Sequence, residues 1–472
     1  MKFSRRICLL LLTMVLLVSA ALPTLAADTS AQSTSGSVGL DSKKPLGGTE
    51  KLLDTAKAAV LYELTSDTMV YAWNPDQTVD PSGMNKVLTA MIALERGNPE
   101  DMVTVSRTVV QSAALVGSVS AGLKHGEEIS LKDLLFCMMV GSANDAAVVI
   151  AEHISGTEEL FVELMNLRAK ELGCENTHFV NASGLPQQGQ YTTARDLAKI
   201  TVAALENELF TEMFNAINYT VPATNKAKER TIKTTNYLTS KETVKTQYDS
   251  RVTGGKTGAL STTDRSLICT AENSGKRYLV VLMSAQGTVT ADGLSVKTFG
   301  SFEETRALLD FGFKEFSFRQ VLQAGQVLAQ YPVEGGENTV YAGSAVELYS
   351  TLPVTVQPED VTFRCVQTKQ LTAPLEAGQV IGTVEVWYRE ICVGTTDLVA
   401  MHEVRGEGTH IQALIPSAEP AVNENLRNWL VIGGLVLAGI LVIGGIVVAF
   451  LILRRKYQLK RRHRLINEGM DR

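Results

Sequence analysis

The chain has 472 residues, a formal net charge of −6 and six cysteines, so it is long enough for two or three domains. The first 27 residues carry +3 and residues 454–472 carry +6, which leaves about −15 for the segment between them. An acidic body disfavours nucleic acid and other polyanions as partners.

The amino terminus has the pattern of a secretory signal. MKFSRRICLLLLTMVLLVSAALPTLAAD combines basic residues, an apolar stretch and small residues near Ala26 and Ala27. This pattern predicts a signal peptide over 1–27, and the residues around the expected cleavage point disfavour the alternative of an uncleaved membrane helix. The Ser/Thr/Gly-rich stretch that follows predicts a disordered linker over 28–50.

The next elements predict a hairpin and then a helical region. AAVLYEL (58–64) and MVYAW (69–73) are β-type runs on either side of the polar SDT. Helical periodicity begins at Lys86 and returns in three later segments: LKDLLFCMMV, DAAVVIAEHI and VELMNLRAKELG.

Two strands and one helix close this domain. RSLICTA (265–271) and RYLVVLMSA (277–285) predict a second hairpin, apolar enough for the centre of a sheet. FEETRALLDFGF (302–313) predicts an amphipathic helix. Because strands stand at both ends of the helical region, the first and last segments are expected to share one sheet in an α+β domain. Short β-like runs from Phe316 predict a separate small all-β domain.

The carboxyl terminus predicts a membrane anchor. Residues 429–453 form an uncharged apolar run, roughly 37 Å long as a helix, and RRKYQLKRRHR follows it. Basic residues favour the cytoplasmic side, so we expect a single-pass protein of the cell membrane with its body on the extracytoplasmic side and its tail in the cytoplasm.

The cysteines and histidines do not indicate a metal site or cofactor. The histidines lack ligand spacing, and the five cysteines outside the signal form no CxxC pattern. Cys365 and Cys392 could pair, although buried free thiols are the alternative. We therefore expect no cofactor and no metal.

Three short motifs lie in the first domain: PSGMNK around Lys86, GSANDAA with Ser142 and Asn144, and GGKTGAL with Lys256, Thr257 and Gly258. Ser142 follows the glycine that ends one predicted helix and precedes another. Lys256 follows two glycines and opens a predicted strand, where small residues let a ligand approach the backbone.

With these motifs in place, the chain resembles the serine-type D-alanyl-D-alanine carboxypeptidases, the low-molecular-weight penicillin-binding proteins. KDLLFCMMVGSANDAA, FVNASGLPQQGQYTTARDLA and SFEETRALLDFGF resemble the family's blocks in the family's order. The resemblance covers roughly 55–404. It implies a penicillin-binding, β-lactamase-like domain (a mixed sheet flanked by a helical subdomain) followed by a β-rich domain, and an activity that removes the terminal D-alanine of the peptidoglycan stem peptide through an acyl-enzyme.

The resemblance also implies roles for matching residues. Lys86 would be the base, Ser142 would relay protons, and Asn144 would contact the substrate. The strand residues Lys256, Thr257 and Gly258 would bind the substrate's carboxylate and backbone, and neighbouring lysines disfavour each other's charge, which permits a neutral amine.

The nucleophile departs from the family pattern. Anchored on Pro81 and Lys86, the pattern Pro-Ala-Ser-x-Thr-Lys places Gly83 where the attacking serine belongs. Loss of a serine nucleophile typically lowers kcat by roughly 10⁶. Ser82 lies near the same helix face as Lys86 and is a candidate substitute, but its position at a helix start favours a capping role.

We therefore expect a membrane-anchored homologue of the carboxypeptidases with impaired or lost acylation, whose ligand is a stem peptide ending in D-Ala-D-Ala, with β-lactams as possible ligands. One alternative is a working or residual carboxypeptidase that uses Ser82 or a directly activated water. Another is a noncatalytic muropeptide-binding or scaffold protein of the cell wall, and a β-lactamase fits less well because of the extra β domain and the membrane span. The expected organisation is a signal peptide (1–27), a linker (28–50), the carboxypeptidase-like domain (51–315), the β-rich domain (316–405), a linker (406–428), a transmembrane helix (429–453) and a basic tail (454–472).

Overall fold

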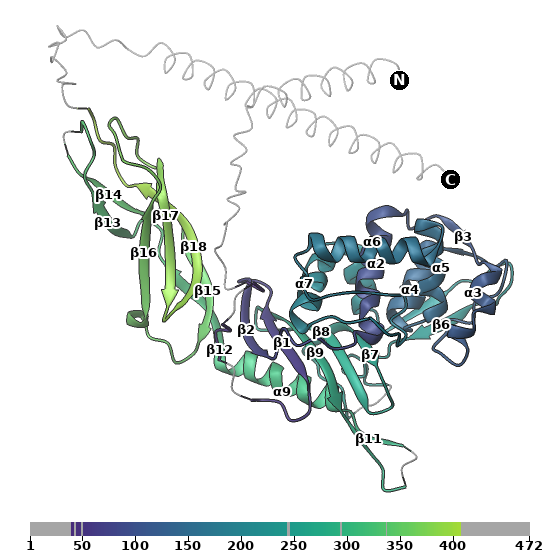
Figure 1. Cartoon of the computed structure of the whole chain (residues 1–472). Helices are drawn as coiled ribbons and strands as arrows, with labels where there is room; N and C mark the ends of the chain where they lie inside the picture. Colours follow the sequence, from purple (N-terminus) through teal and green to yellow (C-terminus); the bar gives the residue numbers. More distant parts are fainter. Residues whose placement is uncertain are drawn as a thin grey trace, which may run out of the picture. The chain divides into compact units, whose positions relative to one another are not determined.

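The computed structural model describes residues 39–41, 44–48, 51–242, 246–292, 295–336 and 338–406 (Figure 1). The predicted signal peptide, transmembrane helix and basic tail lie outside these residues. Within the described ranges no helix has both the length and the apolar character needed to cross a bilayer.

A five-stranded antiparallel sheet forms the centre of the first domain, in the order β2-β1-β9-β8-β7. Both predicted hairpins are confirmed, and their strands pair directly because β1 lies against β9. The first and last segments of the domain thus share one sheet, as expected. The strands are β1 (Ala58–Glu63), β2 (Thr68–Trp73), β7 (Val252–Ala259), β8 (Asp264–Asn273) and β9 (Lys276–Gln286).

Helices cover both faces of this sheet (Figure 1). Val60 belongs to the hydrophobic cluster that contains most helices, whereas its neighbour Leu61 belongs to the cluster that contains α9. This division follows from the alternation of side chains along a strand. The helices are α2 (Lys86–Arg96), α3 (Arg107–Gln111), α4 (Leu131–Val140), α5 (Asn144–Ser155), α6 (Glu158–Glu171), α7 (Ala194–Leu205), α8 (Glu208–Asn215) and α9 (Gly300–Glu315).

Three short antiparallel pairs extend from this domain. None of them was predicted, because each strand is only two to four residues long and mostly exposed. They are β3 (Met102–Thr104) with β4 (Glu128–Ser130), β5 (Asn218–Val221) with β6 (Arg230–Lys233), and β10 (Thr288–Val289) with β11 (Val296–Thr298). Short 3-10 turns η1 (Ser82–Asn85) and η2 (Ala113–Leu115) complete the domain.

The second domain is all-β in its described part, apart from one 3-10 turn, as the sequence predicted. It has a five-stranded sheet in the order β13-β14-β18-β17-β16 and a separate pair, β12 with β15. The elements are β12 (Phe316–Leu322), β13 (Val327–Tyr331), β14 (Val340–Ser344), β15 (Leu348–Pro353), η3 (Pro358–Asp360), β16 (Val361–Gln367), β17 (Val380–Tyr388) and β18 (Ile391–Ala400).

Part of the segment expected to be a disordered linker is attached to the first domain. The backbone N–H of Leu46 donates to Met69 O at 2.9 Å, and that of Gly47 donates to Val70 O at 2.7 Å. Leu46 is also buried in the cluster that contains α9. Residues 44–48 therefore pair with the outer strand β2, which a composition-based prediction could not detect.

The suggested Cys365–Cys392 disulfide does not form. Both thiols are free. Cys365 on β16 lies opposite Val384 of β17, whereas Cys392 on β18 lies opposite Trp387 of the same strand. The strand register places β17 between the two thiols, and the alternative of free cysteines is correct.

Candidate functional site

The first motif forms a tight turn that leads into a buried helix. Ser82 to Asn85 form η1, and α2 begins at Lys86. Ser82 has φ +46°, a left-handed conformation that is uncommon for a residue other than glycine. The first eight residues of α2 are all buried, so Lys86 points into the domain and is only 1 % exposed.

The second motif lies in the gap between two helices. α4 ends at Val140 and α5 begins at Asn144, and Ser142 between them has φ +60°. The backbone N–H of Asn144 donates to Val119 O at 2.8 Å. The Asp145 carboxylate then accepts hydrogen bonds from the segment that follows Val119, so α5 and this segment hold the turn in place.

The third motif lies within β7. The sequence had suggested that Lys256 opens the strand, and this is wrong. The strand begins at Val252 and includes both glycines that precede Lys256. β7 is the last strand of its sheet. No further strand pairs with its outer side in the described residues, and an edge strand of this kind can pair with an extended peptide.

Two hydrogen-bonded lysines join the three motifs. Lys86 Nζ donates to Asn144 Oδ1 at 2.7 Å and to the backbone oxygen of Ser183. Lys256 Nζ donates to Ser142 Oγ at 2.7 Å and to Thr257 O at 2.9 Å. Segments that are distant in the chain thus meet at one polar centre, which contains the matched residues named from the sequence.

Both lysines are in environments that disfavour their charged forms. Burial lowers the pKa of Lys86 well below its usual value, and the nearby Lys256 lowers it further, while Asp145 opposes the change. Burial lowers the pKa of Lys256 to about 7. An amine that is neutral near physiological pH can accept a proton, so the site contains a general base without a histidine or carboxylate.

The low pKa of Lys256 predicts a pH-dependent stability. An unfolded lysine keeps its proton up to about pH 10.4, whereas folded Lys256 loses it near pH 7. The unfolded state therefore binds more protons between these values, and the free energy of unfolding should rise with pH, by about 1 kcal/mol per pH unit from this group. Urea titrations at pH 7.0 to 8.5 should show a smaller rise for Lys256→Met than for the unchanged chain. Equal slopes would contradict the assignment.

Gly83 faces the polar centre. A Cβ atom built on Gly83 would lie 3.3 Å from Thr257 O, 3.4 Å from Ser142 Oγ and 3.8 Å from Lys86 Nζ. These are short but tolerable contacts, so a small side chain fits at this position. It would point at the atoms that the second and third motifs supply.

The hydroxyl of Ser82 lies against Gly258 of the third motif. It is buried and has no hydrogen-bond partner within the described residues. It lies 2.1 Å from where a Cβ of Gly258 would be, so it packs against β7. The predicted capping role is wrong, because this hydroxyl accepts no hydrogen bond within the described residues and neither η1 nor α2 has a side-chain cap.

A turn at 181–185 supports Lys86, and the sequence reasoning assigned it no role. Asn181 Oδ1 accepts a hydrogen bond from the Gly184 N–H at 2.6 Å, and Asn181 O accepts one from Asn85 Nδ2 at 2.9 Å. These bonds place the Ser183 carbonyl against Lys86. The segment NASGL was visible as part of a family-like block, but only the folded structure shows what its carbonyl contacts.

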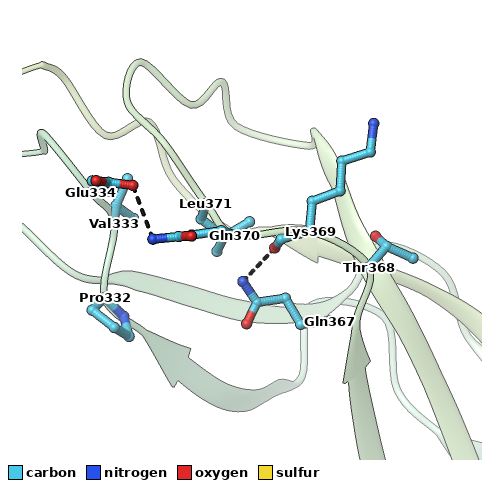
Figure 2. A pocket seen from close by; sticks show the side chains of 8 residues that line it. All are labelled: Pro332, Val333, Glu334, Gln367, Thr368, Lys369, Gln370 and Leu371. Carbon is cyan, nitrogen blue, oxygen red and sulfur yellow. Dashed lines mark hydrogen bonds between the residues drawn. The ribbon is translucent and has the colours of Figure 1, made fainter.

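A pocket in the second domain is less suited to catalysis than the polar centre around Lys86 and Lys256. It is lined by Pro332–Glu334 and Gln367–Leu371, and Figure 2 shows Gln370 Nε2 bonded to Glu334 Oε2, at 3.0 Å. Its charged side chains are exposed to solvent. No group of three or more His, Cys, Asp or Glu in the described part of the chain is arranged to hold a metal ion.

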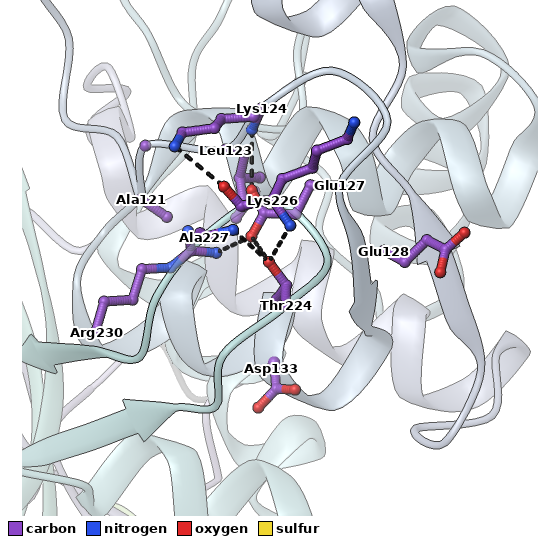
Figure 3. Close-up of polar contacts among 12 residues, drawn as sticks. Ala121, Leu123, Lys124, Glu127, Glu128, Asp133, Thr224, Lys226, Ala227 and Arg230 are labelled. Carbon is purple, nitrogen blue, oxygen red and sulfur yellow. Dashed lines mark hydrogen bonds and ion pairs between the residues drawn. The ribbon is translucent and has the colours of Figure 1, made fainter.

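A second polar cluster has a structural role (Figure 3). The fully buried Glu127 carboxylate accepts hydrogen bonds from Arg230 at 2.8 Å, from the Thr224 hydroxyl at 3.0 Å and from the Lys124 N–H at 3.0 Å. These contacts fasten the turn before β4 to the β5–β6 hairpin. The carboxylate is thereby neutralised and satisfied, which distinguishes it from the amines of the candidate site.

Comparison with known proteins gives consistent results. The family model described as D-alanyl-D-alanine carboxypeptidase matches residues 49–287, and the model described as penicillin-binding protein 5, C-terminal domain, matches residues 316–405. D-alanyl-D-alanine carboxypeptidase DacD of Escherichia coli is 30% identical over 366 residues, which cover 75% of this chain and 88% of that protein. DacF of Bacillus subtilis is 28% identical, over 71% of this chain and 82% of its own length.

A solved structure shares the fold. Penicillin-binding protein 5 from Haemophilus influenzae aligns with a TM-score of 0.59 at 30% identity and covers 76% of this chain and 100% of its own. The alignment includes both domains described above, a penicillin-binding α+β domain and an all-β domain. The chain therefore belongs to the D-alanyl-D-alanine carboxypeptidase family.

Proposed function

We propose that this chain binds peptidoglycan stem peptides ending in D-Ala-D-Ala beside β7, and that its acylation is impaired or lost. The relatives named above, DacD and DacF, are D-alanyl-D-alanine carboxypeptidases, which supports this ligand class. In the polar centre, Lys86 is hydrogen-bonded to Asn144, and Lys256 is hydrogen-bonded to Ser142. These residues provide the groups that bind and activate such a peptide.

The observation that carries the proposal is the position of Gly83. The side-chain position of residue 83 faces Ser142 Oγ and Lys86 Nζ, and glycine leaves that position without a side chain. Glycine has no atom that can form an ester with the substrate. Ser82 is poorly placed to replace it, because its buried hydroxyl packs against Gly258 and makes no hydrogen bond to Lys86 within the described residues.

The proposal includes a membrane location. The apolar run 429–453 and the basic residues after it favour a single span with the folded body outside the cell. Such an anchor would keep the peptide-binding site close to the cell wall. Binding at the cell wall without an acyl-enzyme is favoured over the ordinary carboxypeptidase cycle because Gly83 carries no nucleophile, and the second, all-β domain makes a β-lactamase less fitting.

Calorimetric titration with an N-acylated peptide ending in D-Ala-D-Ala tests the proposed ligand. The full chain is expected to bind this peptide reversibly, and to bind the L-Ala-L-Ala peptide at least tenfold more weakly, because a pairing edge with fixed side chains is stereospecific. Lys256→Met should weaken binding of the D-peptide. Absence of binding, or equal affinity for the two peptides, would contradict the proposal.

A further inference from the structure

The polar atoms around Gly83 form a set of complementary donors and acceptors. Thr257 O, Ser142 Oγ and Lys86 Nζ all lie within 3.8 Å of the position that a Cβ of residue 83 would take. A water molecule needs two to four polar partners to be held at a buried or half-buried site. This region meets that requirement with groups from three separate elements.

The existing hydrogen bonds of Lys86 determine whether its amine can donate to such a water or accept from it. A neutral amine has two N–H donors and one lone pair. Lys86 Nζ already donates to Asn144 Oδ1 and to the Ser183 carbonyl, so both donors of the neutral form are used. Its lone pair is then the remaining group and can accept a hydrogen bond.

Ser142 can donate a hydrogen bond to the same water. Its oxygen accepts a hydrogen bond from Lys256 Nζ at 2.7 Å, so its own O–H is available as a donor. The Thr257 carbonyl is a further acceptor. One water molecule can therefore accept from Ser142 and donate to Lys86 and Thr257, an arrangement that fixes its orientation.

We propose that a water molecule held among Ser142, Lys86 and Thr257 replaces the missing serine and cleaves the bound peptide directly, in one step without an acyl-enzyme. This inference rests on the proposed function, since it needs the D-Ala-D-Ala peptide at the same site. The water oxygen bonds to the carbonyl carbon of the penultimate D-alanine, and its proton passes to Lys86. As the C–N bond breaks, the proton taken up by Lys86 passes to the departing D-alanine amine through the Ser142 hydroxyl, which returns Lys86 and Ser142 to their starting forms. The products are the shortened peptide acid and free D-alanine.

The test measures D-alanine release from an N-acylated D-Ala-D-Ala peptide by the full chain, with glycine added as an acceptor amine. The chain should release D-alanine slowly and form no acceptor-transfer product, because no acyl-enzyme exists to be intercepted. Lys86→Met should slow release on the order of 100-fold. Gly83→Ala should also slow it strongly, because its methyl group would lie too close to the water for both to fit, whereas Ser82→Ala should leave the rate unchanged.

The variants separate this inference from the proposed function. Gly83→Ser is the matched comparison and should form acceptor-transfer product. Peptide binding by the unchanged chain without release above the level of Lys86→Met overturns the water mechanism and leaves the proposed binding function intact. Transfer product from the unchanged chain, or loss of release in Ser82→Ala, also overturns the mechanism. Failure to bind the peptide overturns both.

Discussion

Gly83→Ser is expected to give a protein that a fluorescent penicillin labels covalently. A serine at position 83 would direct its side chain toward Lys86 Nζ and Ser142 Oγ, the atoms that can take up and relay its proton. The gain in acylation rate should be several orders of magnitude, since loss of such a nucleophile costs roughly 10⁶ in a serine hydrolase. The measurement is a denaturing gel of the purified full chain after incubation with the labelled penicillin.

Gly83→Ala is the control for this gain. It adds the same Cβ at the same contacts but no hydroxyl, so it should remain unlabelled while folding like Gly83→Ser. A Gly83→Ser protein that is folded, shown by an unchanged thermal transition, and yet unlabelled would contradict the placement of residue 83 at the nucleophile position.

Gly184→Ala is expected to have the largest effect on stability among single substitutions near the site. Gly184 has φ +73°, and a Cβ added there would lie 1.9 Å from the backbone oxygen of Ser82 and 2.5 Å from Asn85 Oδ1. The left-handed backbone costs about 1–2 kcal/mol for alanine, and forced displacement of η1 adds about 1–3 kcal/mol. The free energy of unfolding should therefore fall by roughly 3 kcal/mol in urea titrations.

Gly275→Ala separates these two costs. Gly275 has φ +77°, almost the same backbone conformation, but a Cβ there meets nothing within 4 Å. Its free energy of unfolding should fall only by the cost of the left-handed backbone, about 1–2 kcal/mol. Equal destabilisation by the two substitutions would show that the contact between the 181–185 turn and η1 does not determine the effect.

The strands and helices with strong periodicity were predictable from sequence. β8 and β9 are nearly continuous apolar runs on either side of the polar ENSGK. They form a hairpin, and both strands lie inside the sheet. The helix from Lys86 was also predictable. Its eight buried residues, however, include Lys86 itself, and the sequence alone could not show that this lysine is buried.

The details of the site depended on contacts between distant segments. The Ser183 carbonyl reaches Lys86 across 97 residues of chain, and no local pattern marks a backbone carbonyl as a partner for an amine. Ser82 illustrates a second limit. Serine after proline at a helix start normally predicts a cap, but Ser82 has a left-handed backbone and lies against β7 and the 181–185 turn, where its hydroxyl accepts no hydrogen bond from the described residues.

The central claim is that no side-chain oxygen of this chain attacks a β-lactam or a D-alanyl peptide. Intact-mass spectrometry of the full chain after prolonged exposure to benzylpenicillin tests it most directly. The unmodified mass is the predicted result. A mass increase equal to one penicillin, located by peptide mapping to Ser82, would contradict it.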